Sequence, residues 1–210
     1  MTIIDLSTTL HAAAAPIRNE PVQARSTARL AALLDSAAAV IDEIGYERLT
    51  TAMVADRAGA SIGTVYRYFP DRIAVLQSLA ARNSERLLAA LSTELSDERH
   101  TTAVHALLGV VDTTAELFRT EPGYKSLRVG DVLDLLPPSS EANGAVVASA
   151  VTAGLGQRFG ITEAAGPAIG TAITVIDALV SRAFARDVRG DAALLDETRR
   201  VVRLVVSEAL

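Results

Sequence analysis

The stretch from Thr51 to Arg72, TAMVADRAGASIGTVYRYFPDR, concentrates side chains that could bind a nucleic acid. It combines hydroxyl groups, two tyrosines and three arginines with two glycines. Hydroxyls and cations bind phosphate oxygens, a small residue lets a helix approach the duplex closely, and longer polar side chains reach the edges of the bases. This combination indicates DNA binding rather than catalysis.

Two short helices must position these side chains. Thr51 is expected to cap the first helix, and Gly59 ends it because a residue without Cβ takes the left-handed conformation at little cost. Ser61 caps the second helix, in which Val65 and Phe69 are spaced to face a core. Helix, short glycine turn and second helix is the arrangement of a major-groove reader.

Glycine, hydroxyl, aromatic and basic positions of this stretch fall in the register of a known signature. They are ADRAG at 55–59, Ser61, Gly63, Thr64, YRYF at 66–69 and the Asp-Arg pair at 71–72. In these positions the chain resembles the tetracycline-repressor family of bacterial transcription factors, over residues 24–95. One departure is Arg72, where family members most often carry Lys. The remaining residues carry no motif that we can match.

Ten residues are predicted to contact DNA: Thr50, Thr51, Ser61, Ile62, Gly63, Thr64, Tyr66, Arg67, Tyr68 and Arg72. The resemblance implies that Tyr66 and Tyr68 touch the DNA backbone and that Arg72 meets a phosphate. From their spacing, we expect both tyrosines to lie off the core face. Three alternatives stay open: Tyr68 packs against the preceding helix, Ile62 belongs to the core instead of touching a thymine methyl group, and Arg67 is only solvated.

Composition and missing motifs argue against several other classes of function. The chain has no cysteine and three scattered histidines, so we expect no disulfide, metal site or cofactor. It has no glycine-rich phosphate loop, nucleophile elbow or carboxylate dyad, so no catalytic residue is predicted and an enzyme is disfavoured. A helical scaffold that uses the two short helices for protein contacts is the other alternative.

Charge and hydropathy indicate a soluble protein. Residues 1–88 hold nine arginines and nine acidic residues, whereas residues 89–210 hold eleven basic and sixteen acidic ones. An acidic second half fits a part that points away from DNA. The longest uncharged run, Ala142 to Gln157, is shorter than the roughly 18 residues of a spanning helix. No basic segment precedes the apolar residues at the N-terminus, so we expect no signal peptide, no membrane partner and a cytoplasmic location.

Periodicity predicts an all-α chain of about nine helices. Residues 1–24 are expected to be a flexible extension, in which Arg18 and Arg25 could alternatively form a minor-groove arm. A three-helix DNA-binding domain follows at 25–72, with Ser26 or Thr27 capping its first helix. A connecting helix spans 73–96. The rest, 97–210, is expected to bind an effector and to dimerise, and includes a short helix from Tyr124 to Leu136.

The second half has only weak signals for particular sites. A small, largely apolar effector is expected because the candidate pocket residues are aliphatic or aromatic: Leu108, Val111, Phe118, Tyr124, Leu133, Val151 and Phe159. Two apolar helix faces are predicted to form the homodimer interface: Ile169, Ile173, Ile176, Val180, Phe184, Leu195, Val202 and Val205. The resemblance implies a four-helix dimer contact. The resulting hypothesis is a repressor that binds a pseudo-palindromic operator and is released by its effector, with a ligand-blind repressor as the alternative.

Overall fold

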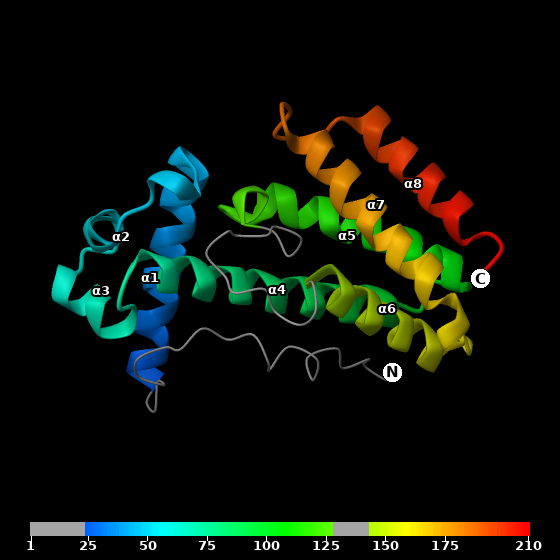
Figure 1. Ribbon diagram of the computed structural model, residues 1–210, viewed down its shortest axis with the longest axis horizontal. Coiled ribbons are helices and arrows are strands. Elements are labelled where there is room, and N and C mark those ends of the chain that lie inside the picture. The colour runs from blue at the N-terminus through cyan, green and yellow to red at the C-terminus, as the bar shows by residue number, and fades with distance from the viewer. Residues whose placement is uncertain (1–23, 128–142) are drawn as a thin grey trace. The chain divides into compact units, whose positions relative to one another are not determined.

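The computed structural model describes residues 24–127 and 143–210, and in these ranges it is helical without a strand (Figure 1). The prediction of an all-α chain is therefore confirmed. Eight α-helices are described: α1 (Ala24–Ile44), α2 (Thr51–Arg57), α3 (Ile62–Tyr68), α4 (Arg72–Ser96), α5 (Ala103–Thr120), α6 (Asn143–Phe159), α7 (Gly166–Phe184) and α8 (Ala192–Val206). Short 3-10 turns lie at η2 (Tyr46–Arg48), η3 (Tyr124–Ser126) and η4 (Glu163–Ala165).

Two predicted helix starts differ from those in the structure. The helix predicted from Tyr124 begins as the 3-10 turn η3, and its continuation lies outside the described residues. Residues 1–23 of the predicted extension at 1–24 also lie outside them, and Ala24 begins α1. The cap predicted at Ser26 or Thr27 is wrong, because both residues lie inside α1. Gly45, with a φ of 81°, follows the last residue of α1.

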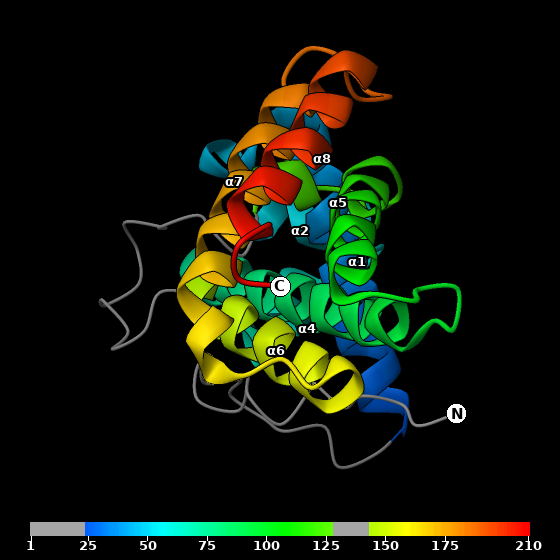
Figure 2. The ribbon, with the colours of Figure 1, turned by 90° about the vertical axis from the view of Figure 1, so that its right-hand side faces the viewer.

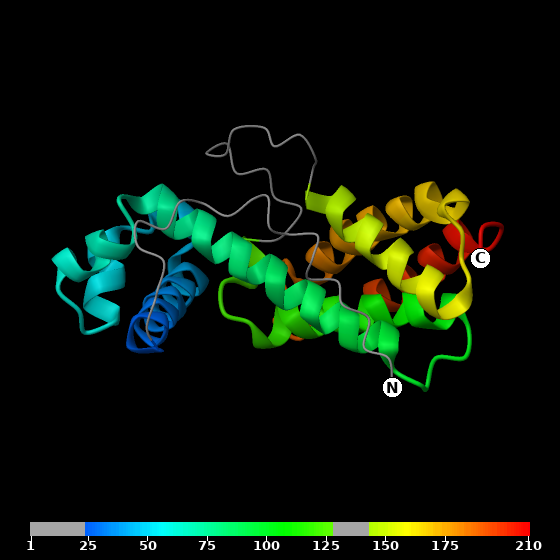
Figure 3. The same cartoon turned by 90° about the horizontal axis from the view of Figure 1, so that it is seen from below.

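The chain divides into two compact units. Of the described residues, the N-terminal unit holds 24–84 and 121–127, and the C-terminal unit holds 85–120 and 143–210. Helix α4 is continuous and contributes its first half to one unit and its second half to the other (Figure 3). The two units therefore share α4, the predicted connecting helix. A segment after α5 also belongs to the N-terminal unit.

A single apolar core holds the N-terminal unit together. One apolar face of α1 is buried, and apolar side chains of α2, α3 and α4 pack against it. The fully buried members include Leu33, Ile41, Val54, Val65, Phe69, Leu76 and Leu79. This core positions the two short helices of the unit.

The segment Glu121–Leu127, which we call the docked segment, is built into this unit. Gly123 adopts a left-handed φ of 73°, and a Cβ at this position would lie 2.9 Å from the carbonyl oxygen of Ala38 on α1. Asp42 accepts a hydrogen bond from the Gly123 amide at 3.2 Å, and its carboxylate lies 3.1 Å from Lys125 Nζ. The segment therefore needs glycine at 123 in order to lie against α1.

Two further contacts complete the docking. Asn83 on α4, with 1% of its surface exposed, donates a hydrogen bond to the Leu127 carbonyl at 2.9 Å. The side chains of Tyr124 and Leu127 are almost completely buried, and Leu127 belongs to the core of α1 to α4. The docked segment thus supplies core residues that lie far away in the sequence.

Replacing Leu127 with Ala is expected to destabilise the N-terminal unit by about 2–5 kcal/mol, because a cavity would replace a buried leucine. Urea unfolding of the full chain measures this loss. Val188→Ala is the control, since Val188 is 82% exposed and should change the midpoint little. Equal midpoints for both variants would show that the docked segment does not support the core.

In the C-terminal unit, α7 packs against α8, α6 and α5 (Figure 2). The apolar stripe of α7 faces these neighbours within the same chain. This contradicts the predicted dimer interface: each of its α7 residues and two of its α8 residues are at most 8% exposed in the single subunit. They are Ile169, Ile173, Ile176, Val180 and Phe184, with Leu195 and Val202. Only Val205 of that set is half-buried.

Residues 163–184, which include α7, have the length and composition of a helix that could cross a membrane. The mean hydropathy of the best window is 1.5, and 33% of that window is buried. Core helices of soluble proteins pass the same test, so this feature alone is weak evidence for a membrane span. The other residues of the window are half-buried or exposed in the single subunit.

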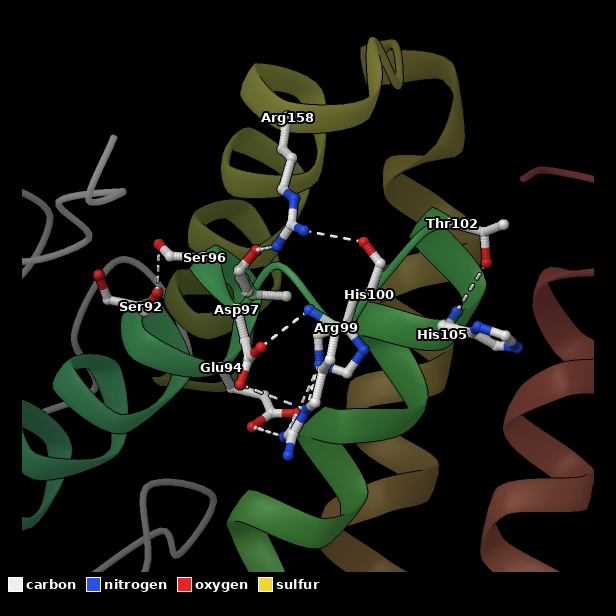
Figure 4. A network of polar contacts seen from close by, with 10 residues as sticks. Ser92, Glu94, Ser96, Asp97, Arg99, His100, Thr102, His105 and Arg158 are labelled. Atoms are coloured by element: carbon white, nitrogen blue, oxygen red, sulfur yellow. Dashed lines mark hydrogen bonds and ion pairs between the residues drawn. The ribbon is translucent and has the colours of Figure 1, made fainter. Parts of the chain in front are cut away.

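A polar network fixes the C-terminal end of α4 within the C-terminal unit (Figure 4). Arg158 of α6 donates hydrogen bonds to the carbonyls of Leu95 at 2.6 Å and His100 at 2.8 Å. The Glu94 carboxylate accepts from Arg99 at 2.5 Å and lies 2.8 Å from His100 Nε2. Because helix ends leave carbonyls without intrahelical partners, Arg158 satisfies one at the end of α4 and so ties α4 to α6.

Candidate nucleic-acid interface

Helix α2 begins one residue earlier than a cap at Thr51 would allow. The N-cap is Thr50, whose hydroxyl accepts a hydrogen bond from the Met53 amide at 3.2 Å. Thr51 is instead the first helical residue, and its hydroxyl lies 3.4 Å from the Tyr66 hydroxyl on α3. Gly59, with φ of 55°, takes the left-handed conformation after α2, as predicted. Because Thr50 and not Thr51 caps α2, the Thr51 hydroxyl is available to link α2 to α3.

Helix α3 has the predicted cap and the predicted core contacts. The Ser61 hydroxyl accepts from the Thr64 amide at 3.2 Å and lies 2.9 Å from the Thr64 hydroxyl. Val65 and Phe69 are fully buried. Asp71 accepts from the Ala74 amide at 2.8 Å and so caps α4. Both ends of α3 are therefore held in place by neighbouring structure.

The opposite face of α3 is open to solvent. Ile62 and Tyr66 are 43% and 44% exposed, and Gly63 and Arg67 beside them are also exposed. Residues four apart are neighbours on a helix. Ile62 and Tyr66 therefore form one column on the surface of α3, and Gly63 and Arg67 form the column beside it. The alternative that Ile62 belongs to the core is thereby excluded. The exposed face has the apolar, small and cationic groups that contact with a DNA groove requires.

Tyr68 does not lie on this face, so the prediction that it lies off the core is wrong. It is 6% exposed, and its hydroxyl lies 3.1 Å from the Ser26 hydroxyl on α1. The physical reason is helical spacing: Tyr68 follows Val65 by three residues and shares its buried face. We therefore leave Tyr68 out of the proposed DNA contacts, in favour of packing against the preceding helix.

The arginines of the unit differ in their availability for phosphates. Arg67 is exposed, and the described residues offer it neither a hydrogen-bond nor an ion-pair partner. Arg72 donates to the Glu47 carbonyl at 2.6 Å, which orients its guanidinium and leaves other donors. Arg57 is paired with Glu43: hydrogen bonding between them lowers the pKa of Glu43 and raises the pKa of Arg57. Arg67 and Arg72 thus keep guanidinium donors that the described contacts do not use.

Gly63 is not required by the fold. Its φ is not positive, and a Cβ there would meet only the Ser61 hydroxyl, at 3.9 Å. A glycine inside a helix destabilises it by about 0.5–1 kcal/mol relative to alanine. Gly63 therefore lowers the stability of α3 without improving its packing. A close approach of DNA at this position would explain the glycine.

Gly63→Ala is accordingly expected to raise the free energy of unfolding by about 0.5–1 kcal/mol and to weaken DNA binding. Thermal unfolding and DNA titration measure the two effects on one sample. Gly144→Ala on α6 is a matched control, since a Cβ there meets no atom within 4 Å and the added methyl group is equally free of clashes. DNA affinity unchanged by Gly63→Ala would contradict a close approach at this position.

The predicted effector residues are not all in one unit. Val111, Phe118 and Val151 are buried in the C-terminal unit, where Leu108 and Phe159 are half-buried. Tyr124 belongs to the N-terminal unit, and Leu133 lies outside the described residues. A surface pocket at the corner between α7 and α8 has a different lining, with charged side chains from Arg182, Arg186, Asp187 and Asp191. None of the predicted effector residues lines that pocket.

The described part of the chain holds no cluster of His, Asp or Glu suited to a metal ion. The proposed minor-groove arm is described only at Arg25, which is exposed at the start of α1, whereas Arg18 lies outside the described residues. Sequence reasoning missed one exposed residue of this surface, Met53 on α2, with 41% of its surface accessible. Its position directly before the buried Val54 and Ala55 was the available signal.

Two segments of the chain match known protein families. Residues 33–79 match the family described as bacterial regulatory proteins, tetR family, and residues 101–207 match the tetracyclin repressor-like C-terminal domain. The HTH-type transcriptional repressor KstR of Rhodococcus jostii is 42% identical over 55 residues, which cover 26% of each chain. The nucleoid occlusion factor SlmA of Pasteurella multocida is 30% identical over 101 residues, 48% of this chain and 49% of SlmA. The chain thus spans about half or less of these curated relatives.

Solved structures extend the similarity over most of the chain. A TetR-family transcriptional regulator from Streptomyces coelicolor has a TM-score of 0.71 and 28% identity, covering 87% of this chain and 99% of that one. FadR of Bacillus subtilis, solved with stearoyl-CoA, has a TM-score of 0.62 at 21% identity, covering 84% and 97%, and so shares the fold. Since the C-terminal family match alone covers half of the sequence, this chain belongs to the tetR family of bacterial regulatory proteins.

Proposed function

We propose that this regulator is a repressor that binds a pseudo-palindromic operator as a homodimer and is released by a small-molecule effector. The exposed face of α3, with Ile62, Gly63, Tyr66 and Arg67 opposite a buried Val65, carries this proposal. One short helix contacts too few base pairs to be selective alone, and two-fold symmetry doubles the site. Similarity to KstR, a protein named as a repressor, supports repression over activation.

The DNA contacts that we propose come from three elements. Thr50, Thr51 and the hydroxyl pair Ser61–Thr64 supply phosphate ligands at the starts of α2 and α3. Tyr66 and Arg67 extend from the exposed face of α3, and Arg72 begins α4. Because bacterial DNA lies in the cytoplasm, we place the protein there.

The dimer contact that we propose uses the uncovered face of α7, not its buried stripe. Thr171, Thr174 and Ala178 recur at three- and four-residue steps and are exposed. On α8, Leu204 is 60% exposed beside the half-buried Val201. Small residues permit close approach of a helix from a second subunit, and the apolar character of α7 needs such a cover.

The effector that we propose is small and largely apolar and binds in the C-terminal unit, among Leu108, Val111, Phe118, Val151 and Phe159. The same fold has been solved with stearoyl-CoA in FadR and with triclosan in SmeT. Both ligand names denote molecules with large apolar parts. The polar pocket between α7 and α8 is less suited to such a molecule, because charged groups line it.

Two connections can carry the effector signal to the N-terminal unit. Helix α4 contributes to both units, and α5 runs directly into the docked segment. An effector can weaken DNA binding only as far as it prefers the non-binding state, typically by about 1–3 kcal/mol. Operator DNA must then weaken effector binding by the same factor. Equal effector affinities with and without operator would support the ligand-blind repressor.

Selection of bound duplexes from fragmented genomic DNA tests the function directly. We expect enrichment of inverted repeats whose half-site centres lie in steps of roughly 10 base pairs. Affinity should fall steeply with salt, because phosphate contacts release counterions. A scaffold that used α2 and α3 for protein contacts would enrich no sequence and show no such dependence.

A further inference from the structure

The N-terminal unit leaves several large apolar side chains exposed, and phosphate binding does not explain them. Met53, Ile62, Tyr66 and Ile73 are four of the six large hydrophobic residues that the described chain leaves exposed. Ile62 is an aliphatic side chain without a polar atom, so it cannot bind phosphate. Its exposure of 43% also shows that the core does not need it.

Ile62 lies where a groove contact is sterically possible. It begins α3, and its neighbour Gly63 has no side chain that would hold the helix away from the duplex. Four residues on, Tyr66 occupies the same column, with its hydroxyl turned to Thr51 of α2 at 3.4 Å. A side chain that forms hydrogen bonds thus follows the aliphatic one in the same column of α3.

Only one group in the major groove is apolar, namely the C5-methyl group of thymine. We propose that Ile62 contacts a thymine methyl group in each half-site and so selects thymine at that position. This inference rests on the proposed function, because it requires the exposed face of α3 to lie in the major groove. The contact would add sequence preference to a surface whose hydroxyls and arginines bind phosphates.

Replacement of thymine by deoxyuridine tests the contact, because it removes the methyl group and keeps every hydrogen-bonding group. The probe is a duplex recovered by selection with the wild-type protein, with each thymine replaced singly. At the contacted position we expect roughly fourfold weaker binding for one half-site and roughly fifteenfold for both, from the value of one buried methyl group. Other positions serve as internal controls.

A variant cycle then assigns the contact to Ile62. Ile62→Ala should bind the thymine and deoxyuridine duplexes equally at the contacted position, whereas Ile62→Val, which keeps a branched apolar group, should retain most of the difference. Ile62→Ala should also keep the thermal midpoint of the wild type, since the residue is exposed. Ile73→Ala, the exposed isoleucine at the start of α4, is the matched control and should retain the full deoxyuridine effect.

Two results would overturn the inference. One is a selected duplex in which no thymine is sensitive to deoxyuridine. The other is a sensitive thymine whose effect is the same in the wild type and in Ile62→Ala. Failure to select any duplex is a different outcome, since it would refute DNA recognition itself and therefore the proposed function.

Discussion

Phe69→Ala is expected to destabilise the N-terminal unit by about 3–5 kcal/mol, the largest loss that we expect for any truncation in α3 or at its end. Phe69 is fully buried in the core that α1, α3 and α4 share. The aromatic ring is lost and the surrounding helices close the cavity only partly. Because the whole stability of a domain is about 5–15 kcal/mol, much of the margin would disappear. Urea unfolding of the full chain measures the change.

Tyr66→Ala provides the contrast on the same helix. Tyr66 is 44% exposed, so its truncation should leave the unfolding midpoint nearly unchanged. DNA binding should weaken roughly 10- to 100-fold through loss of a hydrogen bond to a charged group. If Tyr66→Ala unfolded the protein, or if it bound DNA normally, the assignment of this face to DNA would be wrong.

Ile176→Asp is expected to unfold the C-terminal unit rather than to dissociate a dimer. Ile176 is 2% exposed within one subunit, and an unpaired charge buried there costs about 3–5 kcal/mol. Ala178→Asp places the same charge two residues away on the exposed face of α7. It should leave the fold intact and give monomers at micromolar concentration. Thermal unfolding and sedimentation velocity separate the two outcomes.

Ala153→Asp is the matched control for the dimer, since it adds the same charge to an exposed alanine of α6. We expect it to remain dimeric. Should Ala178→Asp stay dimeric as well, another surface would form the contact. Should the wild type sediment as a monomer, the proposed two-fold reading of the operator would fail with it.

Local chemistry made much of the N-terminal unit predictable from the sequence. A serine cap and a positive-φ glycine each act within a few residues, so Ser61 and Gly59 could be placed without the fold. The spacing of Val65 and Phe69 likewise assigned their buried face. Strict use of that spacing would also have placed Tyr68 in the core, because it shares the face of Val65.

The C-terminal helices show why apolar stripes alone were insufficient. Their periodicity correctly predicted α7 and α8 as helices, but an apolar stripe does not specify its partner. The stripe of Ile169, Ile173 and Ile176 could face the same subunit or a second one. Packing against α5, α6 and α8 decides that it faces the same subunit, and this leaves another face of α7 for a dimer.

By itself, then, the sequence determined the helical class, the two short helices and most of the exposed face of α3 that we propose for DNA contact, because hydrogen-bonded caps and helical spacing are local. Tertiary structure alone decided the docked segment, where Asp42 and Asn83 hold residues about 40 to 80 positions away in sequence. It also decided which apolar faces are covered. Such contacts depend on which distant segments pack together. The free energy that favours one packing over another comes from the whole core and not from any local sequence pattern.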